Sequence, residues 1–286
     1  MGPTRNSRTQ VFALRAAPIQ INQFSWASGA EYMDYIIADP VTMPAHFQHG
    51  YTEKLATLPH TLFATDNTRP IADRTPSRES MGLPNDGLVF CCFNNLYKIT
   101  PEVFAVWMEI MRAVPRSVLW LRELNPVMAN NLRASAQTHG IAPERLVFAG
   151  RVASMDDHLA RHRLADLFLD TFPFTAQTTA SDALWAGLPV VTRMGESPMS
   201  RIAGSMLTAL GMPELVTEDM VSYRQLILTL AHDASQRRAL RERLQAARYS
   251  EKLFNTTLYT RHMEQLYLKM VQRLRAGLPP DHLAVE

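Results

Sequence analysis

The chain has 286 residues, of which 47% are hydrophobic and 20% are charged, and its formal net charge at pH 7 is +2. This composition is ordinary for a water-soluble globular protein, and the length allows one large domain, or one complete domain with part of a second. The small net charge and the scattered basic residues favour neither nucleic acid nor a membrane surface as a partner. No run of about 20 apolar residues is present, so no transmembrane span is expected.

The cysteines and the N-terminus indicate the compartment. The two cysteines, Cys91 and Cys92, are adjacent. Neighbours on a strand point to opposite faces, so we expect two buried thiols in a reducing compartment and no internal disulfide. The opening MGPTRNSRTQ has no apolar core of the kind that a signal peptide requires. We therefore expect a cytoplasmic protein.

The chain up to residue 86 is irregular in pattern. Residues 12–66 contain short apolar pieces such as APIQIN and YMDYIIAD. Residues 66–86 are polar and rich in proline, which is typical of a linker or a long loop.

After residue 87 the pattern predicts a regular alternation of strands and helices. The apolar run LVFCCF predicts a buried strand, and Thr100 with Pro101 forms a typical N-cap and first helical residue. Apolar residues at helical spacing predict a helix that ends at Pro115. The further expected elements are the strand SVLWL, a helix at about 127–139, the strand RLVFAG, the short helix MDDHLARHR, the strand LFLDT, the helix TTASDALWAG, the strand PVVT, the helix SRIAGSMLTALG and the segment ELVT. About six buried strands alternating with helices predict an α/β fold with a parallel, doubly wound sheet.

Two helical segments follow this alternation. The basic segment SQRRALRERLQAAR also contains Glu242, and we interpret it as a solvated helix face. A long helix is expected at about 255–274, and we interpret its apolar stripe as core packing, with a protein-binding surface as the alternative. The stripe consists of Tyr259, Met263, Leu266, Tyr267, Met270, Val271 and Leu274.

Three strand-to-helix loops carry the polar residues that suit a ligand. In an open parallel sheet, ligands bind beyond the carboxyl ends of the strands, so all three loops are expected to open on one edge. The candidates are Asn94, Asn95, Tyr97 and Lys98 in the first loop, His158 and Arg161 in the second, and Gln177, Thr178, Thr179 and Asp182 in the third.

These residue types together predict a site for a nucleotide diphosphate. A helix start such as QTTASD attracts phosphate through free N–H groups and the helix dipole. Lys98 adds a positive charge, and Asp182 can accept hydrogen bonds from ribose or sugar hydroxyls. Each residue alone has a simpler interpretation: a threonine as N-cap, Asp182 as a favourable charge near a helix start, and Lys98 as a surface lysine. The convergence of three loops on one edge favours the joint interpretation.

Several common motifs are missing from the sequence. No GxGxxG follows a strand, which disfavours a nicotinamide or flavin dinucleotide fold, and no GxxxxGK[ST] is present, which excludes the common phosphate-loop ATPases. No Cys/His set has zinc spacing, and no GxSxG appears.

The motifs resemble the catalytic region of protein O-linked N-acetylglucosamine transferases. The segments that resemble its C-terminal catalytic lobe are FNNLYKITPEVFAVWMEIMRAVPRSVLWL, RLVFAGRV, QTTASDALWAGLPVVTRMGESPMSRIAGSML and LFNTTLYTRHMEQLYLKM, while FALRAAPIQIN and SGAEYMDYIIADP are similar to the end of the first lobe. The resemblance covers nearly the whole chain and implies a GT-B fold of the family 41 type. We accordingly expect the tail of the N-terminal lobe and a linker over 1–80, a complete Rossmann-like nucleotide-sugar lobe over 81–254, and a C-terminal helix and tail over 255–286.

The resemblance also implies an activity and a set of site residues. The family transfers N-acetylglucosamine from UDP-GlcNAc to Ser or Thr hydroxyls of proteins without a metal, so no cofactor is expected beyond the UDP-sugar donor. Lys98 corresponds to the lysine that neutralises the diphosphate, and Asp182 to the ribose-binding acid. Asn95 falls where the family commonly has a glutamine that faces the phosphates. The other matches are Ala153 and Arg161 at the uracil, His158 at the nucleotide, and Thr178 and Thr179 at the diphosphate.

Departures from the family pattern keep two alternatives open. Gln177 and Met155 stand where animal members have histidine and lysine, and INQFSWASGA lacks the Gly-Tyr-Pro-Gly run that usually follows APIQ. The earlier part of the first lobe and the tetratricopeptide repeats are not in the sequence, so we expect a truncated or split transferase, with another chain as a possible source of the missing part. The alternatives are a non-catalytic nucleotide-sugar-binding module and another GT-B enzyme that uses a different UDP- or GDP-sugar.

Overall fold

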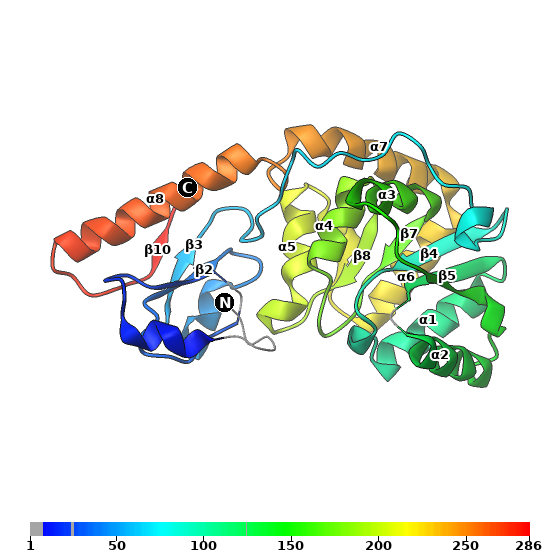
Figure 1. Cartoon of the computed structure of the whole chain (residues 1–286), viewed down its shortest axis with the longest axis horizontal. Coiled ribbons are helices and arrows are strands. Elements are labelled where there is room, and N and C mark those ends of the chain that lie inside the picture. Colours follow the sequence, from blue (N-terminus) through cyan, green and yellow to red (C-terminus); the bar gives the residue numbers. More distant parts are fainter. Residues whose placement is uncertain (1–7, 24–25, 124) are drawn as a thin grey trace.

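The chain forms two parallel β-sheets, each with its own hydrophobic core, in a computed structural model that describes residues 8–23, 26–123 and 125–286. Figure 1 shows the two sheets side by side, with the helix α7 over the larger one and α8 over the smaller one. Every strand pairing within both sheets is parallel. The α/β fold class predicted from the sequence is confirmed.

The larger sheet has the strand order β6-β5-β4-β7-β8-β9. Its strands are β4 (Leu88–Cys92), β5 (Ser117–Arg122), β6 (Leu146–Ala149), β7 (Leu167–Leu169), β8 (Val190–Arg193) and β9 (Val216–Thr217). Counted along the chain, the order is third, second, first, fourth, fifth and sixth, which is that of a doubly wound nucleotide-binding fold. The order reverses between β4 and β7, and the crevice at this reversal is where such sheets bind ligands.

Eight α-helices are formed by the described residues. They are α1 (Pro101–Ala113), α2 (Pro126–Thr138), α3 (Met155–Ala160), α4 (Thr178–Trp185), α5 (Ile202–Ala209), α6 (Met220–His232), α7 (Ala234–Ser250) and α8 (Thr256–Arg275). Thr100 caps α1 as predicted, because its side chain accepts a hydrogen bond from the backbone N–H of Val103. The helix α6 was not predicted, although its buried residues Tyr223, Ile227 and Leu230 have helical spacing.

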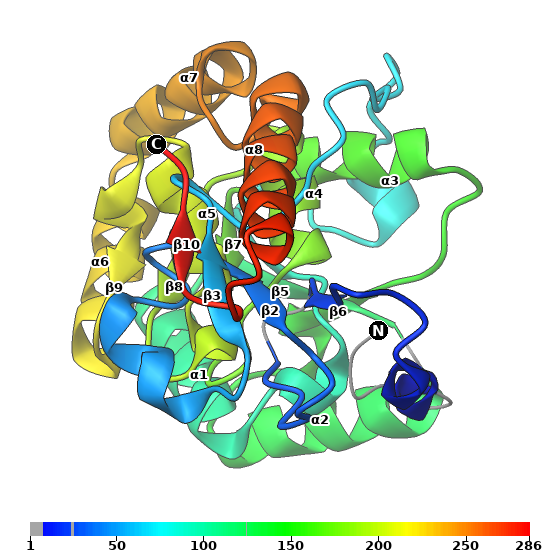
Figure 2. The same cartoon turned by 90° about the vertical axis from the view of Figure 1, so that its left-hand side faces the viewer.

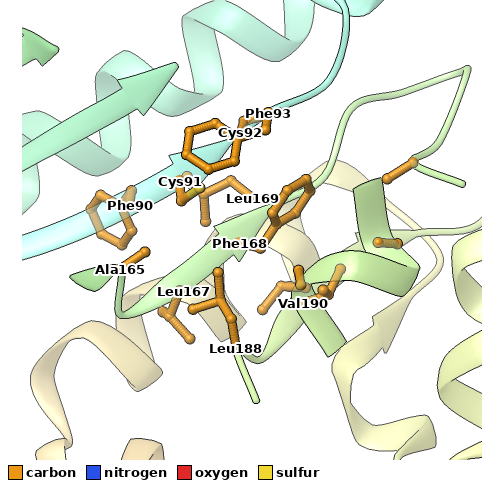
Figure 3. Packing of buried hydrophobic residues seen from close by; sticks show 14 of the residues in the cluster. Phe90, Cys91, Cys92, Phe93, Ala165, Leu167, Phe168, Leu169, Leu188 and Val190 are labelled. Atoms are coloured by element: carbon orange, nitrogen blue, oxygen red, sulfur yellow. The ribbon is translucent and has the colours of Figure 1, made fainter. Parts of the chain in front are cut away.

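The strand β4 shows why the larger sheet could be predicted from the sequence. Its residues from Val89 to Cys92 are fully buried because helices cover both faces of a parallel sheet, so apolar residues run without alternation. Figure 3 shows Phe90, Cys91 and Cys92 of this run beside Leu167, Phe168 and Leu169 of β7. Both cysteines are free and buried, as predicted. The turn before β4 needs Gly87, whose φ is +92° and where a Cβ atom would lie 2.0 Å from the carbonyl oxygen of Arg116.

The smaller sheet joins both ends of the chain. Its order is β1-β2-β3-β10, and its strands are β1 (Ile21–Asn22), β2 (Tyr35–Ala38), β3 (Lys54–Thr57) and β10 (Leu283–Ala284). Figure 2 shows β10 next to β3. No strand had been predicted in the C-terminal tail.

The long C-terminal helix was predicted close to its observed bounds. Met263, Leu266 and Met270 lie in the core of the smaller sheet. Tyr267 and Leu274 are exposed, so the interpretation of the whole stripe as core packing was wrong for these two residues. Only part of the apolar stripe is buried, because α8 packs against only one side of a small sheet.

The chain crosses between the two sheets twice. Residues 66–86 form the first crossing and contain one short 3-10 helix, Glu79–Met81, and no strand. The second crossing lies between α7 and α8. Hydrogen bonds join the two where the first begins and the second ends: the hydroxyl of Thr65, directly before the first crossing, donates to the carbonyl of Leu253 (2.7 Å), and the hydroxyl of Thr256, the first residue of α8, donates to the carbonyl of Thr65 (3.2 Å).

Candidate functional site

A cavity of about 550 Å³ lies at the carboxyl edge of the larger sheet. It is bordered by the ends of β4, β5 and β6, by the starts of α3 and α4, and by the first crossing. Six of the eleven predicted site residues line it: Ala153, His158, Arg161, Thr178, Thr179 and Asp182. The structure therefore brings together residues from the second and third predicted loops.

Arg161 is buried at the floor of this cavity. Its Nη1 donates to the carbonyl of Gly150 (2.9 Å), and its guanidinium carbon lies 4.4 Å from the ring centroid of Phe93. Burial lowers the pKa of Arg161, but a guanidinium remains charged at any ordinary pH. These contacts fix a planar cation against an aromatic ring, where it can bond to the edge of a planar ligand.

Arg161 also sets the tautomer of His158. Its Nη2 lies 2.7 Å from Nδ1 of His158, and an arginine can only donate. Nδ1 is therefore the acceptor, and the ring proton of a neutral His158 lies on Nε2. That atom lies 3.7 Å from Oδ2 of Asp182, so the histidine connects the cation to the carboxylate.

Asp182 has a second partner that the sequence did not reveal. Oδ1 of Asp182 accepts a short hydrogen bond from Nη1 of Arg69, and Arg69 also lines the cavity. Burial alone would raise the pKa of Asp182, but interactions with His158 and Arg69 lower it below the usual value. The carboxylate is ionised and retains lone pairs for further donors. Arg69 lies in a segment without periodicity, so no local sequence signal indicated its role.

The start of α4 differs from the simplest expectation. Gln177, and neither threonine, occupies the N-cap position, and no side chain caps the helix. The side chain of Gln177 contacts Sδ of Met199 instead, at 3.5 Å. The hydroxyl of Thr179 donates a short hydrogen bond to the side-chain oxygen of Asn94. The first-turn N–H groups of α4 are thus available to an anion. An anion site accounts for the two threonines at the helix start, whereas the interpretation of a threonine as the N-cap residue does not.

Five predicted site residues do not belong to the cavity lining: Asn94, Asn95, Tyr97, Lys98 and Gln177. Nζ of Lys98 donates to the carbonyl of Thr175 (2.9 Å) and lies 3.8 Å from the ring centroid of Phe174. Burial lowers the pKa of Lys98, while the charge of Asp170 opposes the shift. Tyr97 is exposed, and the side-chain oxygen of Asn95 lies 3.5 Å from Nη1 of Arg122.

Asp170 organises the loop between β7 and α4. Its carboxylate accepts hydrogen bonds from the backbone N–H groups of Thr171 and Ala176 (both 2.7 Å) and from the Thr192 hydroxyl (2.7 Å). The side-chain amide of Asn94 also donates to it, at 3.2 Å. Burial raises the pKa of Asp170 to about 6 against the effect of these bonds. Sequence reasoning missed this residue, although an aspartate at the end of an apolar strand was a visible signal.

The site combines cations, a free helix start and one ionised carboxylate. The first two suit an anionic group, and the carboxylate suits vicinal hydroxyls, so a phosphorylated sugar or a nucleotide matches the donor set. Among residues 8–23, 26–123 and 125–286, no group of three or more His, Cys, Asp or Glu side chains is placed to hold a metal ion. None of the helices in the same ranges is long and apolar enough to cross a membrane.

Known proteins resemble this chain over most of its length. Glycosyl transferase family 41 matches residues 1–75 and 64–263. The chain is 35% identical over 292 residues to a probable UDP-N-acetylglucosamine–peptide N-acetylglucosaminyltransferase, SEC, of Arabidopsis thaliana, covering 99% of this chain and 30% of that protein. It is 30% identical over 395 residues to the Caenorhabditis elegans UDP-N-acetylglucosamine–peptide N-acetylglucosaminyltransferase, covering 99% of this chain and 34% of that protein. It thus spans about a third of the length of these curated relatives.

A solved structure matches as well. A variant of the Thermobaculum terrenum O-GlcNAc transferase superposes with a TM-score of 0.80 at 30% sequence identity. The match covers 92% of this chain and 51% of that chain.

Proposed function

Because the chain belongs to glycosyl transferase family 41 and has a GT-B fold, we propose that it is a glycosyltransferase, or the donor-binding portion of one. It transfers N-acetylglucosamine from UDP-GlcNAc to Ser or Thr hydroxyls of a protein. The relatives are named for this donor and for a peptide acceptor. The relatives are about three times as long as this chain, so binding of the protein acceptor is proposed from the family alone.

The cavity at the reversal of strand order carries the proposal. The ionised Asp182 is suited to accept hydrogen bonds from the ribose hydroxyls, and Arg161, beside Ala153, to meet the edge of the uracil. The uncapped start of α4, with Thr178 and Thr179, is suited to the diphosphate.

In the proposed reaction, the acceptor hydroxyl displaces UDP at the anomeric carbon. The oxygen of the acceptor bonds to that carbon and gives up its proton to the solvent as the bond from the carbon to the β-phosphate oxygen breaks, and the diphosphate gains negative charge. Thr178, Thr179 and the N–H groups behind them stabilise this charge. Lys98 belongs to the same set once its ammonium group turns from the Thr175 carbonyl toward the diphosphate. These groups supply the positive potential, so we propose that no metal is needed.

One observation favours a second candidate, a nucleotide-sugar-binding module that does not transfer. Lys98 is engaged with Thr175 and Phe174 and does not line the cavity. The two candidates share the donor site and differ only in turnover. The cytoplasmic location remains a proposal too, supported by two buried free thiols.

Calorimetry of the full chain with UDP, in excess chelator, tests the donor site. We expect UDP to bind without added metal and more tightly than GDP, since the uracil contacts come from Arg161 and its neighbours. Loss of binding on chelation would exclude the metal-free site, and equal binding of GDP would exclude the uracil assignment. Sugar transfer to a peptide then separates the transferase from the binding module.

A further inference from the structure

A second cavity, of about 420 Å³, lies at the C-terminal end of α4, whose N-terminal end borders the donor site. It is bordered by the first crossing, by the C-terminal end of α4 and by α7. Four arginines line it, Arg69, Arg163, Arg241 and Arg248, and none of its lining residues within the described part of the chain is acidic. Arg69 is ion-paired with Asp182 of the donor cavity, and the charge of Asp166 acts on Arg241, so the positive potential of this concave surface comes from the remaining guanidinium charge.

Two of these arginines bond only to uncharged acceptors. Nη2 of Arg241 donates a short hydrogen bond to the carbonyl of Ala165, and burial lowers the pKa of Arg241. Nη1 of Arg163 donates to the carbonyl of Ala72 (2.8 Å) and approaches the Thr75 hydroxyl (3.2 Å). Carbonyls and hydroxyls satisfy N–H groups without cancelling their charge. Both side chains therefore keep a net positive charge at the cavity.

The other two arginines have donors without acceptors. Nε of Arg248, and both Nε and Nη2 of Arg69, are buried and have no hydrogen-bond partner among the described residues. The guanidinium carbon of Arg248 lies 4.8 Å from the ring centroid of Trp185, which positions it but offers no acceptor. Buried donors are nearly always paired in folded proteins, and unpaired charged donors are costly. An anion in the cavity would compensate the charge of Arg248 and offer acceptors to these donors, whereas the charge of Arg69 is already paired with Asp182.

We propose that this cavity is a second anion site, which binds a phosphate-bearing small molecule. The volume lies within the range of small-molecule pockets, roughly 300–1,000 Å³. Arginine forks match the geometry of phosphate oxygens, and several of them favour a diphosphate over a singly charged ion. A purely structural role, in which the arginines tie the crossing to the larger sheet, accounts for Arg163 but not for the unpaired donors of Arg69 and Arg248.

Titration calorimetry of the full chain with inorganic pyrophosphate tests the proposal. Since Arg69 also lines the donor cavity, the informative variants are Arg241→Gln and Arg248→Gln. Each removes one charged donor set, and we expect pyrophosphate to bind about tenfold or more weakly, which corresponds to about 1.4 kcal/mol or more. Arg238→Gln is the matched control, because it makes the same charge change at an exposed position of α7. It should change the affinity less than twofold.

Further measurements show which of the two cavities binds the anion and whether the ligand is a nucleotide or a free inorganic anion. Pyrophosphate can also occupy the proposed diphosphate site at the start of α4, so Thr178→Val should leave intact only the part of its binding that depends on Arg241 and Arg248. UDP binding should survive Arg248→Gln. ATP in place of pyrophosphate separates a nucleotide from a free inorganic anion, and saturable binding of either that depends on Arg241 and Arg248 supports the site. Equal losses in Arg238→Gln, or a loss confined to Thr178→Val, would overturn the proposal. If Arg241→Gln fails to fold, as judged by circular dichroism, the test relies on Arg248→Gln and the charge-retaining Arg248→Lys. We expect Arg248→Lys to bind pyrophosphate more weakly than the wild type.

Discussion

Replacing Asp182 with asparagine distinguishes a carboxylate that contacts the nucleotide from one that only holds Arg69. In the structure, Oδ1 of Asp182 accepts from Nη1 of Arg69, and the two side chains are 11% and 21% exposed. Nε and Nη2 of Arg69 have no other acceptor in the part of the chain that the structure describes. The asparagine variant therefore leaves a largely buried guanidinium without its counter-charge.

The magnitudes follow from this burial. Breaking a fully buried ion pair by removing one partner destabilises a protein by about 3–5 kcal/mol, and a fifth of the Arg69 side chain reaches solvent. We expect Asp182→Asn to lower the free energy of unfolding by about 2 kcal/mol after this discount. The loss of a hydrogen bond between ribose and a charged acceptor, about 1.5–3 kcal/mol, should weaken UDP binding by about 10- to 100-fold.

A double-mutant cycle with Arg69→Met is the assay. Urea unfolding and UDP calorimetry are measured on the wild type, both single variants and the double variant. If Asp182 contacts the nucleotide, asparagine weakens UDP binding with or without Arg69. If the loss vanishes in the Arg69→Met background, Asp182 acts through Arg69 and the ribose assignment is refuted. A coupling energy near zero in the unfolding data would show that the ion pair does not stabilise the fold.

Two further predictions concern catalysis and pH. Lys98→Ala should lower the rate of sugar transfer by about 10²–10³-fold and weaken donor binding less, because the ammonium group faces more negative charge in the transition state than in the bound donor. The assay uses a protein with the first-lobe region restored, and equal turnover of the wild type and Lys98→Ala would remove Lys98 from the mechanism. Burial lowers the pKa of His162 to about 3, so the unfolded chain binds a proton that the folded chain does not. The contribution of His162 to the free energy of unfolding should therefore fall by about 2 kcal/mol from pH 6.5 to 5. Asp170, whose pKa is raised to about 6, contributes with the opposite sign over this range, so the informative quantity is the difference between two proteins. Urea unfolding at both pH values should show that the wild type loses about 2 kcal/mol more than His162→Gln on acidification.

The larger sheet could be predicted because its signals are local. Strands buried on both faces appear as continuous apolar runs, and helix starts such as Thr100 with Pro101 need only neighbouring residues. The smaller sheet gave no such signal, because its strands have two to four residues and β10 joins from the far end of the chain. Pairing between distant segments depends on tertiary structure, which local patterns do not encode.

The candidate site divides in the same way. The loops after parallel strands share one edge by topology, which is why His158, Arg161 and Asp182 were found together. The rotamer of Lys98 and the arrival of Arg69 from the first crossing depend on contacts between segments far apart in sequence. No pattern within either segment specifies them.

The hydrogen bonds between the two crossings restrict how the halves of the molecule can move. Thr65 is bonded to both Leu253 and Thr256, so the outgoing and returning chains lie together at one place. Any motion that separates the two crossings at this place has to break these hydrogen bonds. Arg69 lies four residues beyond Thr65 and is paired with Asp182, so the bonds that hold the crossings together also fix the segment that carries the counter-charge of the donor cavity.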